Sequence, residues 1–249
     1  MELHPATHGF DSSAERYERG RPGYPAAAID RLVAGLGGAA RPGAVVADVG
    51  AGTGKLTRPL LDRGLRVIAV EPVGGMRATL ARTAPAADVR AGQAEALPLD
   101  AGAVDGIVAG QAFHWFATAA TLREFARVLR PDGRLGLIWN RRDLDQPLQA
   151  EITRLVAPYR GDAPAHAGDE WRAAFSAAAP FALEAEHRIP HAQTLDADGL
   201  ADRVLSISFI AALPGAERRS VEGRVRALAR AAPVELRYVT ELFVYARRA

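Results

Sequence analysis

The chain has 249 residues, of which 49% are hydrophobic, and a formal net charge of +2. That size suffices for one large hydrophobic core and does not require a second domain. Cysteine is absent, which excludes disulfides and thiolate metal sites. Positive charge comes almost entirely from arginine, with Lys55 the only lysine, and it alternates with glutamate. No basic stripe for nucleic acid is therefore indicated.

Membrane and metal signals are also missing from the sequence. Residues 1–20 contain no apolar run typical of a signal peptide, and no apolar stretch approaches the ~20 residues that span a bilayer. We expect a cytoplasmic protein with no nucleic-acid or membrane partner. His166, His187 and His191 are expected at the surface. No cluster has metal-ligand spacing, which predicts a metal-independent reaction.

Strand and helix patterns alternate up to residue 140, after a polar N-terminal cap segment at 1–25. Short apolar runs ending in glycine are typical of strands that a parallel sheet buries on both faces. Such runs predict strands at 45–49, 66–70, 88–90, 104–109 and 135–139. Helices are predicted at 26–36, 56–63, 76–83 and 121–129, with a turn at 130–133. This order predicts an α/β fold with a doubly wound parallel sheet, as a single domain over 1–249.

The pattern changes after residue 140. Helical pieces are predicted at 152–158, 171–178, 200–212 and 217–231. A strand with one wet face is predicted at 182–189, and a final strand rich in β-branched and aromatic residues at 236–246. Residues 145–215 are expected to supply a lid over the acceptor, the molecule on which the protein would act. Its large apolar side chains either line an apolar pocket or form ordinary core: Trp171, Phe175, Phe209 and Ile210.

A glycine loop at 48–54, reading Asp-Val-Gly-Ala-Gly-Thr-Gly, stands between a buried strand and a helix. A nucleotide P-loop fails because Val49 and Leu56 occupy its two ends. A dinucleotide fingerprint fails because Lys55 occupies its sixth position. Asp48 would repel a pyrophosphate and would suit an ammonium group. The charge therefore favours S-adenosylmethionine (SAM), which has an ammonium, a sulfonium and no phosphate, over NAD.

Glu71 closes the second strand, about twenty residues after the glycine loop. A carboxylate at that place can accept hydrogen bonds from both hydroxyls of a ribose. A solvated acid at a strand end is the plainer alternative. The position of Glu71 relative to the glycine loop favours ribose binding. Glu71 alone does not distinguish an NAD site from a SAM site, because both cofactors contain ribose.

Taken together, the motifs resemble the class I SAM-dependent methyltransferases, in particular the small-molecule branch that includes trans-aconitate methyltransferase-like proteins. The resemblance covers roughly residues 10 to 140 and is carried by segments at 46–54, 70–72, 92–99, 105–108, 111–116 and 127–133. Beyond them, Ser206-Ile207-Ser208 also resembles this branch. The family implies a Rossmann-like, doubly wound seven-stranded sheet with its last strand antiparallel and with helical lid elements.

The resemblance also implies site residues for SAM and its product S-adenosyl-L-homocysteine (SAH). Those at the methionine moiety are Asp48, Gly50, Ala51 and Gly52. Glu71 would bind the ribose, and the adenine would lie against Met76, Gln93 and Ala94. Pro72, which follows Glu71, is also expected at the cofactor. Gly110 and Gln111 follow the fourth strand at the edge where open α/β sheets bind ligands. Tyr17 and Arg21 resemble an N-terminal segment that folds over SAM.

His114 is the candidate base, since an unperturbed imidazole titrates near pH ~6.5. The alternative is a histidine that holds its loop, with Trp115 beside it as an anchor or a substrate contact. Trp139 and Arg141 end the fifth strand beside the expected acceptor site. Arg141 either clamps a substrate carboxylate or is an ordinary surface arginine.

Three functions fit the sequence to different degrees. The first is methyl transfer to O, N or C of a small molecule by in-line displacement. The second is a SAM-binding protein without methyl transfer, serving as a binding module or catalysing another reaction. The third, RNA methylation, would need a basic face or a base-clamping motif after the fourth strand, where residues 111–116 lie instead.

Overall fold

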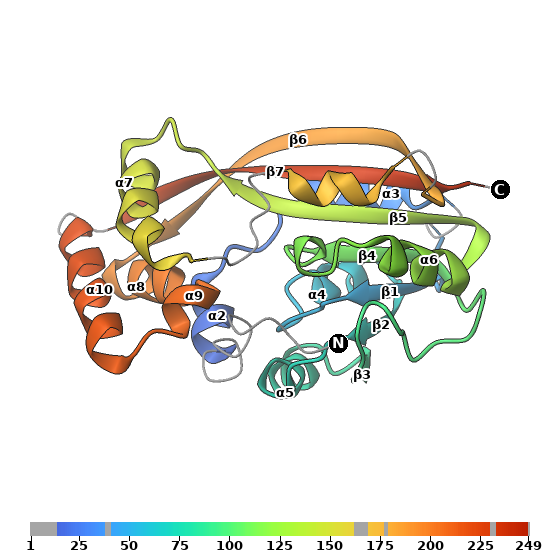
Figure 1. Cartoon of the computed structure of the whole chain (residues 1–249), viewed down its shortest axis with the longest axis horizontal. Coiled ribbons are helices and arrows are strands. Elements are labelled where there is room, and N and C mark those ends of the chain that lie inside the picture. Colours follow the sequence, from blue (N-terminus) through green and yellow to red (C-terminus); the bar gives the residue numbers. More distant parts are fainter. Residues whose placement is uncertain (1–13, 38–40, 162–168, 177–178, 230–232, 249) are drawn as a thin grey trace. The chain divides into compact units, whose positions relative to one another are not determined.

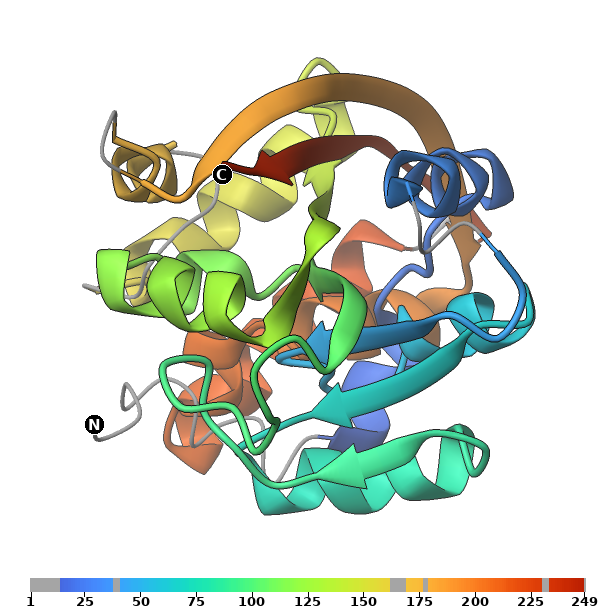
Figure 2. The same ribbon diagram turned by 90° about the vertical axis from the view of Figure 1, so that its right-hand side faces the viewer.

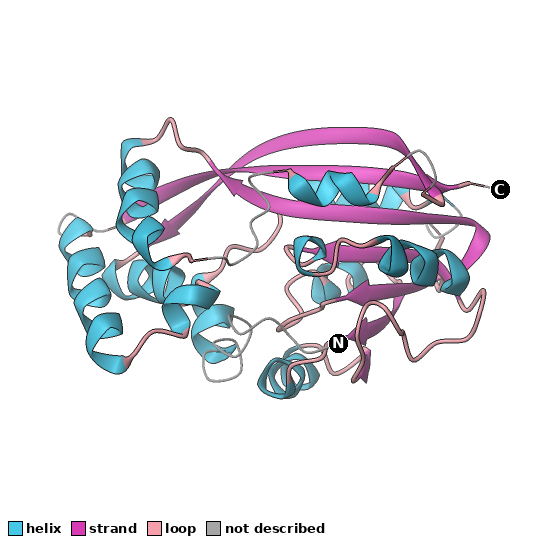
Figure 3. Ribbon diagram, in the orientation of Figure 1, coloured by secondary structure: helices cyan, strands magenta, loops and turns pink. Residues whose placement is uncertain are grey.

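The computed structural model describes residues 14–37, 41–161, 169–176, 179–229 and 233–248. Seven strands form one sheet in the order β3-β2-β1-β4-β5-β7-β6 (Figure 1; Figure 3). The strands are β1 (Val45–Val49), β2 (Arg66–Val70), β3 (Asp88–Arg90), β4 (Val104–Gly110), β5 (Leu129–Arg142), β6 (Phe181–Leu195) and β7 (Val234–Arg247). Residues 1–13 of the predicted cap segment, and His166, lie outside the described residues.

Strands β1 to β5 are parallel, because β1 pairs with β2 and β4, β3 with β2, and β5 with β4. The last strand, β7, runs antiparallel to β5. Arg247, at the end of β7, donates from Nη1 to the carbonyl of Leu129, where β5 begins. Asp143, just past β5, donates its N–H to the carbonyl of Arg237 near the start of β7. The predicted Rossmann-like sheet with a reversed last strand is confirmed.

The helices of the sheet are α3 (Ala26–Gly35), α4 (Thr57–Leu61), α5 (Gly74–Thr83) and α6 (Ala119–Val128), with short 3-10 turns η3 (Phe113–Trp115) and η6 (Glu170–Ala174). The other helices are α2 (Ala14–Gly20), α7 (Pro147–Val156), η4 (Ala157–Tyr159), α8 (Ala197–Leu205), α9 (Ser208–Ala211) and α10 (Gly215–Leu228).

Successive strand residues enter two different cores. Along β4, Ile107 and Ala109 belong to the cluster that holds α6, whereas Val108 belongs to the cluster that holds α3 and α4. Figure 2 shows α3, in blue, and α6, in green, on opposite faces of these strands. Both faces are apolar because helices cover both, as parallel sheets require.

Three predicted elements need correction. The turn at 130–133 is wrong: β5 begins at Leu129, and these residues form an irregularity where its pairing with β4 shifts register. The helix at 200–212 is two helices, α8 and α9, which Ser206 and Ile207 separate. The helical piece beginning at Trp171 is the short 3-10 turn η6.

The chain divides into two compact units. The sheet unit comprises Tyr24–Asn140, Pro164–Ile189 and Thr240–Ala249, and the helical unit comprises Met1–Gly23, Arg141–Ala163 and Pro190–Val239. The expected lid at 145–215 therefore has residues in both units, and its role stays a prediction. Among the described residues, no helix is both long enough and apolar enough to cross a membrane.

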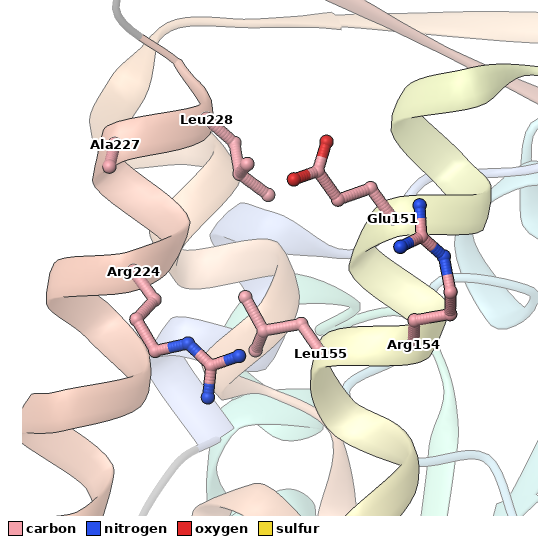
Figure 4. Close-up of a pocket in the computed structure, with 6 residues that line it drawn as sticks. All are labelled: Glu151, Arg154, Leu155, Arg224, Ala227 and Leu228. Atoms are coloured by element: carbon pink, nitrogen blue, oxygen red, sulfur yellow. The ribbon is translucent and has the colours of Figure 1, made fainter.

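The helical unit has its own core, and surface pairs hold its helices. Arg16 and Arg19 of α2 both pair with Asp202 of α8, at 3.1 and 2.7 Å. A cavity of about 370 Å³ lies between α7 and α10. Figure 4 shows Glu151 and Arg224 extending from the two helices into the space between them.

Candidate functional site

The glycine bend follows β1 directly. Gly50 and Gly52 have φ values of +70° and +58°, which side chains with a Cβ rarely adopt. The N–H groups of Gly50 and Ala51 donate to the carbonyl of Val70, at 2.8 and 3.2 Å, which ties the bend to the end of β2. A Cβ on Gly50 would lie 2.7 Å from the Cβ of Ala112, whereas a Cβ on Gly52 would meet nothing within 4 Å. The backbone at Gly52 therefore has open space beside it.

Asp48 is fully buried beneath this bend. Thr57, in the first turn of α4, donates its hydroxyl to Oδ2 of Asp48 at 2.7 Å. The other oxygen, Oδ1, is buried and has no hydrogen-bond partner among the described residues. Burial raises the pKa of Asp48 to about 7, against the lowering effect of the Thr57 bond, and the charge of Glu71 adds to the rise. The site thus holds a buried acid without a positive partner.

Glu71 reaches the same bend from the end of β2. Its Oε2 accepts the N–H of Gly52 and its Oε1 accepts the N–H of Val73, both at 2.9 Å. Burial raises the pKa of Glu71, while these two N–H groups and the charge of Arg77 oppose the rise. Each carboxylate oxygen has two lone pairs, so each keeps a site for a further donor. The carboxylate is therefore held in one orientation and can still accept hydrogen bonds.

The other residues predicted at the cofactor follow neighbouring strands. Pro72 comes after Glu71, and its carbonyl accepts Nη1 of Arg77 at 2.6 Å. Met76 is buried on α5. Gln93 bridges to Ala96 after β3, with the buried Ala94 between them.

Gly110 and Gln111 lie where β4 ends. Gln111 has a φ of +59°, which is rare outside glycine, and its N–H donates to the carbonyl of Ile138 at 2.9 Å. Its side-chain amide donates to the carbonyl of Asn140 at 3.2 Å. A Cβ on Gly110 would lie 2.6 Å from the hydroxyl of Tyr24. Both bonds hold Gln111 to β5, and a strained residue fixed in this way at a strand end is typical of functional positions.

His114 and Trp115 form η3, just after β4. The indole Nε1 of Trp139 donates to Nδ1 of His114 at 3.3 Å, and the His114 ring lies against Trp115. Trp139 itself is fully buried and packs against Trp171, with 4.7 Å between ring centroids. When Nδ1 accepts a hydrogen bond, the neutral imidazole carries its proton on Nε2.

Tyr17, Arg21 and Arg141 belong to the helical unit. Arg21 lies over the ring of Tyr17, 5.0 Å from its centroid. It also donates to Oγ and to the carbonyl of Ser206, at 3.1 and 3.0 Å. The structure thus brings the remaining predicted residues together in the sheet unit and these three in the other.

The sequence did not predict three residues that support the site through hydrogen bonds. Thr57 was not predicted, although a hydroxyl in the first turn after a glycine loop is a readable signal. Arg77, which donates to the carbonyls of Glu71 and Pro72, stands one residue after the predicted Met76. Asn140, whose Oδ1 accepts the hydroxyl of Thr240 at 2.7 Å, has a partner a hundred residues away and no local signal.

Comparison with known proteins relates the chain to methyltransferases. Residues 47–137 match the family model described as a methyltransferase domain. An uncharacterized methyltransferase of Mycobacterium tuberculosis is 40% identical over 238 residues, covering 93% of this chain and 92% of that protein. An uncharacterized methyltransferase-like protein of Schizosaccharomyces pombe is 32% identical over 225 residues, covering 90% and 87%.

Solved structures share the fold. A protein described as a type II methyltransferase from Anaeromyxobacter dehalogenans aligns with a TM-score of 0.67 at 22% identity, covering 91% of this chain and 97% of that one. A protein described as a methyltransferase from an antibiotic biosynthesis pathway of Anabaena variabilis aligns at 0.62 and 23% identity, covering 88% and 95%. By its sequence relatives and its fold, the chain belongs to the class I SAM-dependent methyltransferase superfamily and is a methyltransferase.

Proposed function

We propose that this methyltransferase binds SAM at the glycine bend and transfers its methyl group to a small-molecule acceptor. The observation that carries the proposal is the buried Oδ1 of Asp48, which has no hydrogen-bond partner among the described residues. A buried charge without a partner is costly, and a cationic group beside it offsets that cost. SAM has such a group in its ammonium, whereas a phosphate would add to the repulsion.

The remaining geometry supports the same cofactor. Gly52 leaves open space where a Cβ would stand, so a ligand can approach the backbone. Two backbone N–H groups hold the carboxylate of Glu71, and each of its oxygens keeps a lone pair that can accept a hydrogen bond from a ribose hydroxyl. Pro72, Met76, Gln93 and Ala94 follow on neighbouring elements and are proposed to surround the adenine.

When bound, SAM supplies a methyl group activated by its sulfonium. The protein's part is then to orient the acceptor and to exclude water, and orientation can lower a barrier by ~7–11 kcal/mol in favourable systems. Gln111, strained and held by Ile138 and Asn140, fixes the backbone at the end of β4. Gly110 and Gln111 are proposed to contact the cofactor there.

His114 remains the candidate catalytic residue. Its Nδ1 accepts from Trp139, so we assign its neutral form a proton on Nε2. In that form Nε2 donates to an acceptor oxygen and does not act as a base. A base role would require the proton to move to Nδ1 and the bond from Trp139 to be given up. Trp115 and Arg141 are proposed acceptor contacts.

The finer parts of the proposal come from the sequence. They are the narrower resemblance to trans-aconitate methyltransferase-like proteins, the cytoplasmic location, and cofactor contacts from Tyr17 and Arg21. The side chain of Arg21 is held in one orientation, because it donates to both oxygens of Ser206. Ser206 begins the Ser-Ile-Ser segment on which that resemblance partly rests.

Calorimetry tests the cofactor first. The protein should bind SAM and SAH and should not bind NADH or ATP. Binding of NADH or ATP without SAH would contradict the proposal. Release of SAH from SAM in the presence of an acceptor panel then separates a methyltransferase from a protein that only binds SAM. A protein that binds SAM but transfers to none of the panel is tested again with cell extract of low molecular mass.

A further inference from the structure

Arg203 of α8 is a buried cation in the helical unit, with only 5% of its surface exposed. Its Nε donates to the hydroxyl of Tyr238 at 2.9 Å, and its guanidinium lies 5.7 Å from the centre of that ring. Its Nη1 is buried and has no hydrogen-bond partner among the described residues. The guanidinium of Arg203 thus uses only part of its hydrogen-bonding capacity.

Arg142, at the end of β5, is linked to Arg203 through β7: the next residue, Asp143, donates its N–H to the carbonyl of Arg237 at 3.1 Å, and Arg237 precedes Tyr238, whose hydroxyl binds Arg203. Its Nη1 donates to the hydroxyl of Thr153 at 3.1 Å. Burial lowers the pKa of Arg142 to about 9, and the positive charges of Arg203, Arg21 and Arg160 lower it further. Arg142 therefore lies in a positive field.

Arg142 and Arg203 have no counter-ions among the described residues. Within the parts of the chain that the structure describes, no carboxylate forms an ion pair with Arg142 or Arg203, whose partners are the hydroxyls of Thr153 and Tyr238. Other arginines of the unit are paired: Arg226, for example, reaches Asp198 at 2.5 Å. Clustered guanidinium groups without an anion are costly to bury, so the cluster is suited to an anionic ligand.

We propose that Arg142 and Arg203 form a binding site for a carboxylate or phosphate group of the acceptor substrate. Guanidinium forks match the planar oxygens of a carboxylate or the faces of a phosphate with paired hydrogen bonds. Arg21, which donates to Ser206 just after α8, adds to the positive charge around Arg142. The assignment of the anion to the acceptor rests on the proposed function, whereas the anion site itself does not.

Calorimetry of the full chain at constant ionic strength tests this site. The probes are citrate, inorganic phosphate, and trimethyl citrate, which has the citrate skeleton without its charges. Citrate or phosphate should bind the wild type, and trimethyl citrate should not. Arg142→Gln should lower the affinity for the anion about tenfold or more, since it removes one partner of a buried charged contact.

Two variants control for structure. Arg154→Gln removes an exposed arginine from the same helix as Thr153 and should leave the affinity unchanged. Arg142→Lys keeps the charge but loses the fork, and it should bind the anion with intermediate affinity if Arg142→Gln does not fold. Failure of both anions to bind the wild type, or equal losses in Arg142→Gln and Arg154→Gln, would overturn the site.

SAH binding separates the two proposals and the two sources of the anion. We expect Arg142→Gln to bind SAH within about twofold of the wild type, because Arg142 is not among the residues that we assign to the cofactor. If neither citrate nor phosphate binds but Arg142→Gln loses SAH affinity, the cofactor's own carboxylate is the anion and the assignment to the acceptor is wrong. If the wild type binds anions through Arg142 but does not bind SAH, the proposed function fails and the anion site stands.

Discussion

The two compact units bury charges of opposite sign. In the sheet unit Asp48 is buried with an oxygen that lacks a partner among the described residues, and Glu71 is buried beside it. In the helical unit Arg203 is buried with a nitrogen that also lacks a hydrogen-bond partner among the described residues. Arg142 lies in the positive electrostatic field of Arg203. Proteins seldom bury such groups without compensation. We infer that each unit keeps its charge for a ligand group of the opposite sign.

Glu71 and the arginines of the helical unit are held by different means, whereas Asp48, like the arginines, is held by a side-chain hydroxyl, that of Thr57. Backbone N–H groups of Gly52 and Val73 fix Glu71, so its position follows from the course of the chain. Side-chain hydroxyls of Thr153 and Tyr238 hold the arginines. The position of Glu71 should therefore be sensitive to backbone changes, and the arginine site to changes of single side chains.

The largest expected effect is on the pH dependence of stability without ligand. The pKa of Asp48 rises from 3.8 to about 7 on folding, so its carboxyl stays protonated in the folded state where the unfolded chain has ionised. This contribution to stability is full below pH 3.8 and is lost as the pH rises toward 7. Between pH 3 and pH 6 the wild type should therefore lose about 3 kcal/mol of stability that Asp48→Asn does not lose, as measured by urea unfolding. Parallel pH curves for the two proteins would contradict the buried, unpaired acid.

The same substitution should have the opposite effect on binding. Asp48→Asn removes the charge that we assign to the cofactor's ammonium, and we expect about a 100-fold loss of SAH affinity by calorimetry. Asp105→Asn is the matched control, because Asp105 is also buried but pairs with Arg130 outside the bend. Retained SAH affinity in Asp48→Asn would remove the electrostatic basis of the proposed function.

In the helical unit, Tyr238→Phe should lower stability by about 2 kcal/mol, because Nε of Arg203 loses its acceptor while it stays buried. Tyr245→Phe serves as the control, since the hydroxyl of Tyr245 makes no hydrogen bond to any described residue. Chemical denaturation of both variants measures the difference. Equal stabilities would mean that water satisfies Arg203, and the comparison between the units would weaken.

Gly52→Ala and Gly64→Ala compare backbone sensitivity. Both glycines have positive φ, +58° and +76°, and both have open space at the Cβ position. Both variants should lose about 1–2 kcal/mol of stability from the left-handed backbone. Only Gly52→Ala should also lose SAH affinity, about tenfold, because its Cβ enters the proposed ligand space. Equal SAH affinity in the two variants would place the ligand elsewhere.

The parallel sheet and the acid–glycine arrangement could be predicted because their signals are local. A buried run ending in glycines marks β1, and Glu71 closes β2 at the expected spacing. Local signals failed at 130–133, where Pro-Asp-Gly suggests a turn. There the ion pair of Arg130 with Asp105 and the pairing of β5 with β4 keep the chain in the strand.

The arginine cluster could not be predicted for a similar reason. Arg21, Arg142 and Arg203 are far apart in the chain, and in a sequence rich in arginine none of them stands out. Sequence reasoning chose Arg141, their neighbour at the strand end. Only the fold shows which of the two adjacent arginines lies in the field of Arg203.

The role of His114 has the smallest expected signal and also depends on a distant partner. Because Trp139 donates to Nδ1, the neutral ring should carry its proton on Nε2, and nitrogen NMR of the imidazole distinguishes the two tautomers. Trp139→Phe removes the donor and should increase the share of the Nδ1–H form, without changing SAH affinity. If the wild type already has its proton on Nδ1, Nε2 has a free lone pair, and His114 can serve as the base for a hydroxyl acceptor. If the proton is on Nε2, His114 orients the acceptor by donating to it, and an acceptor that must lose a proton needs another base.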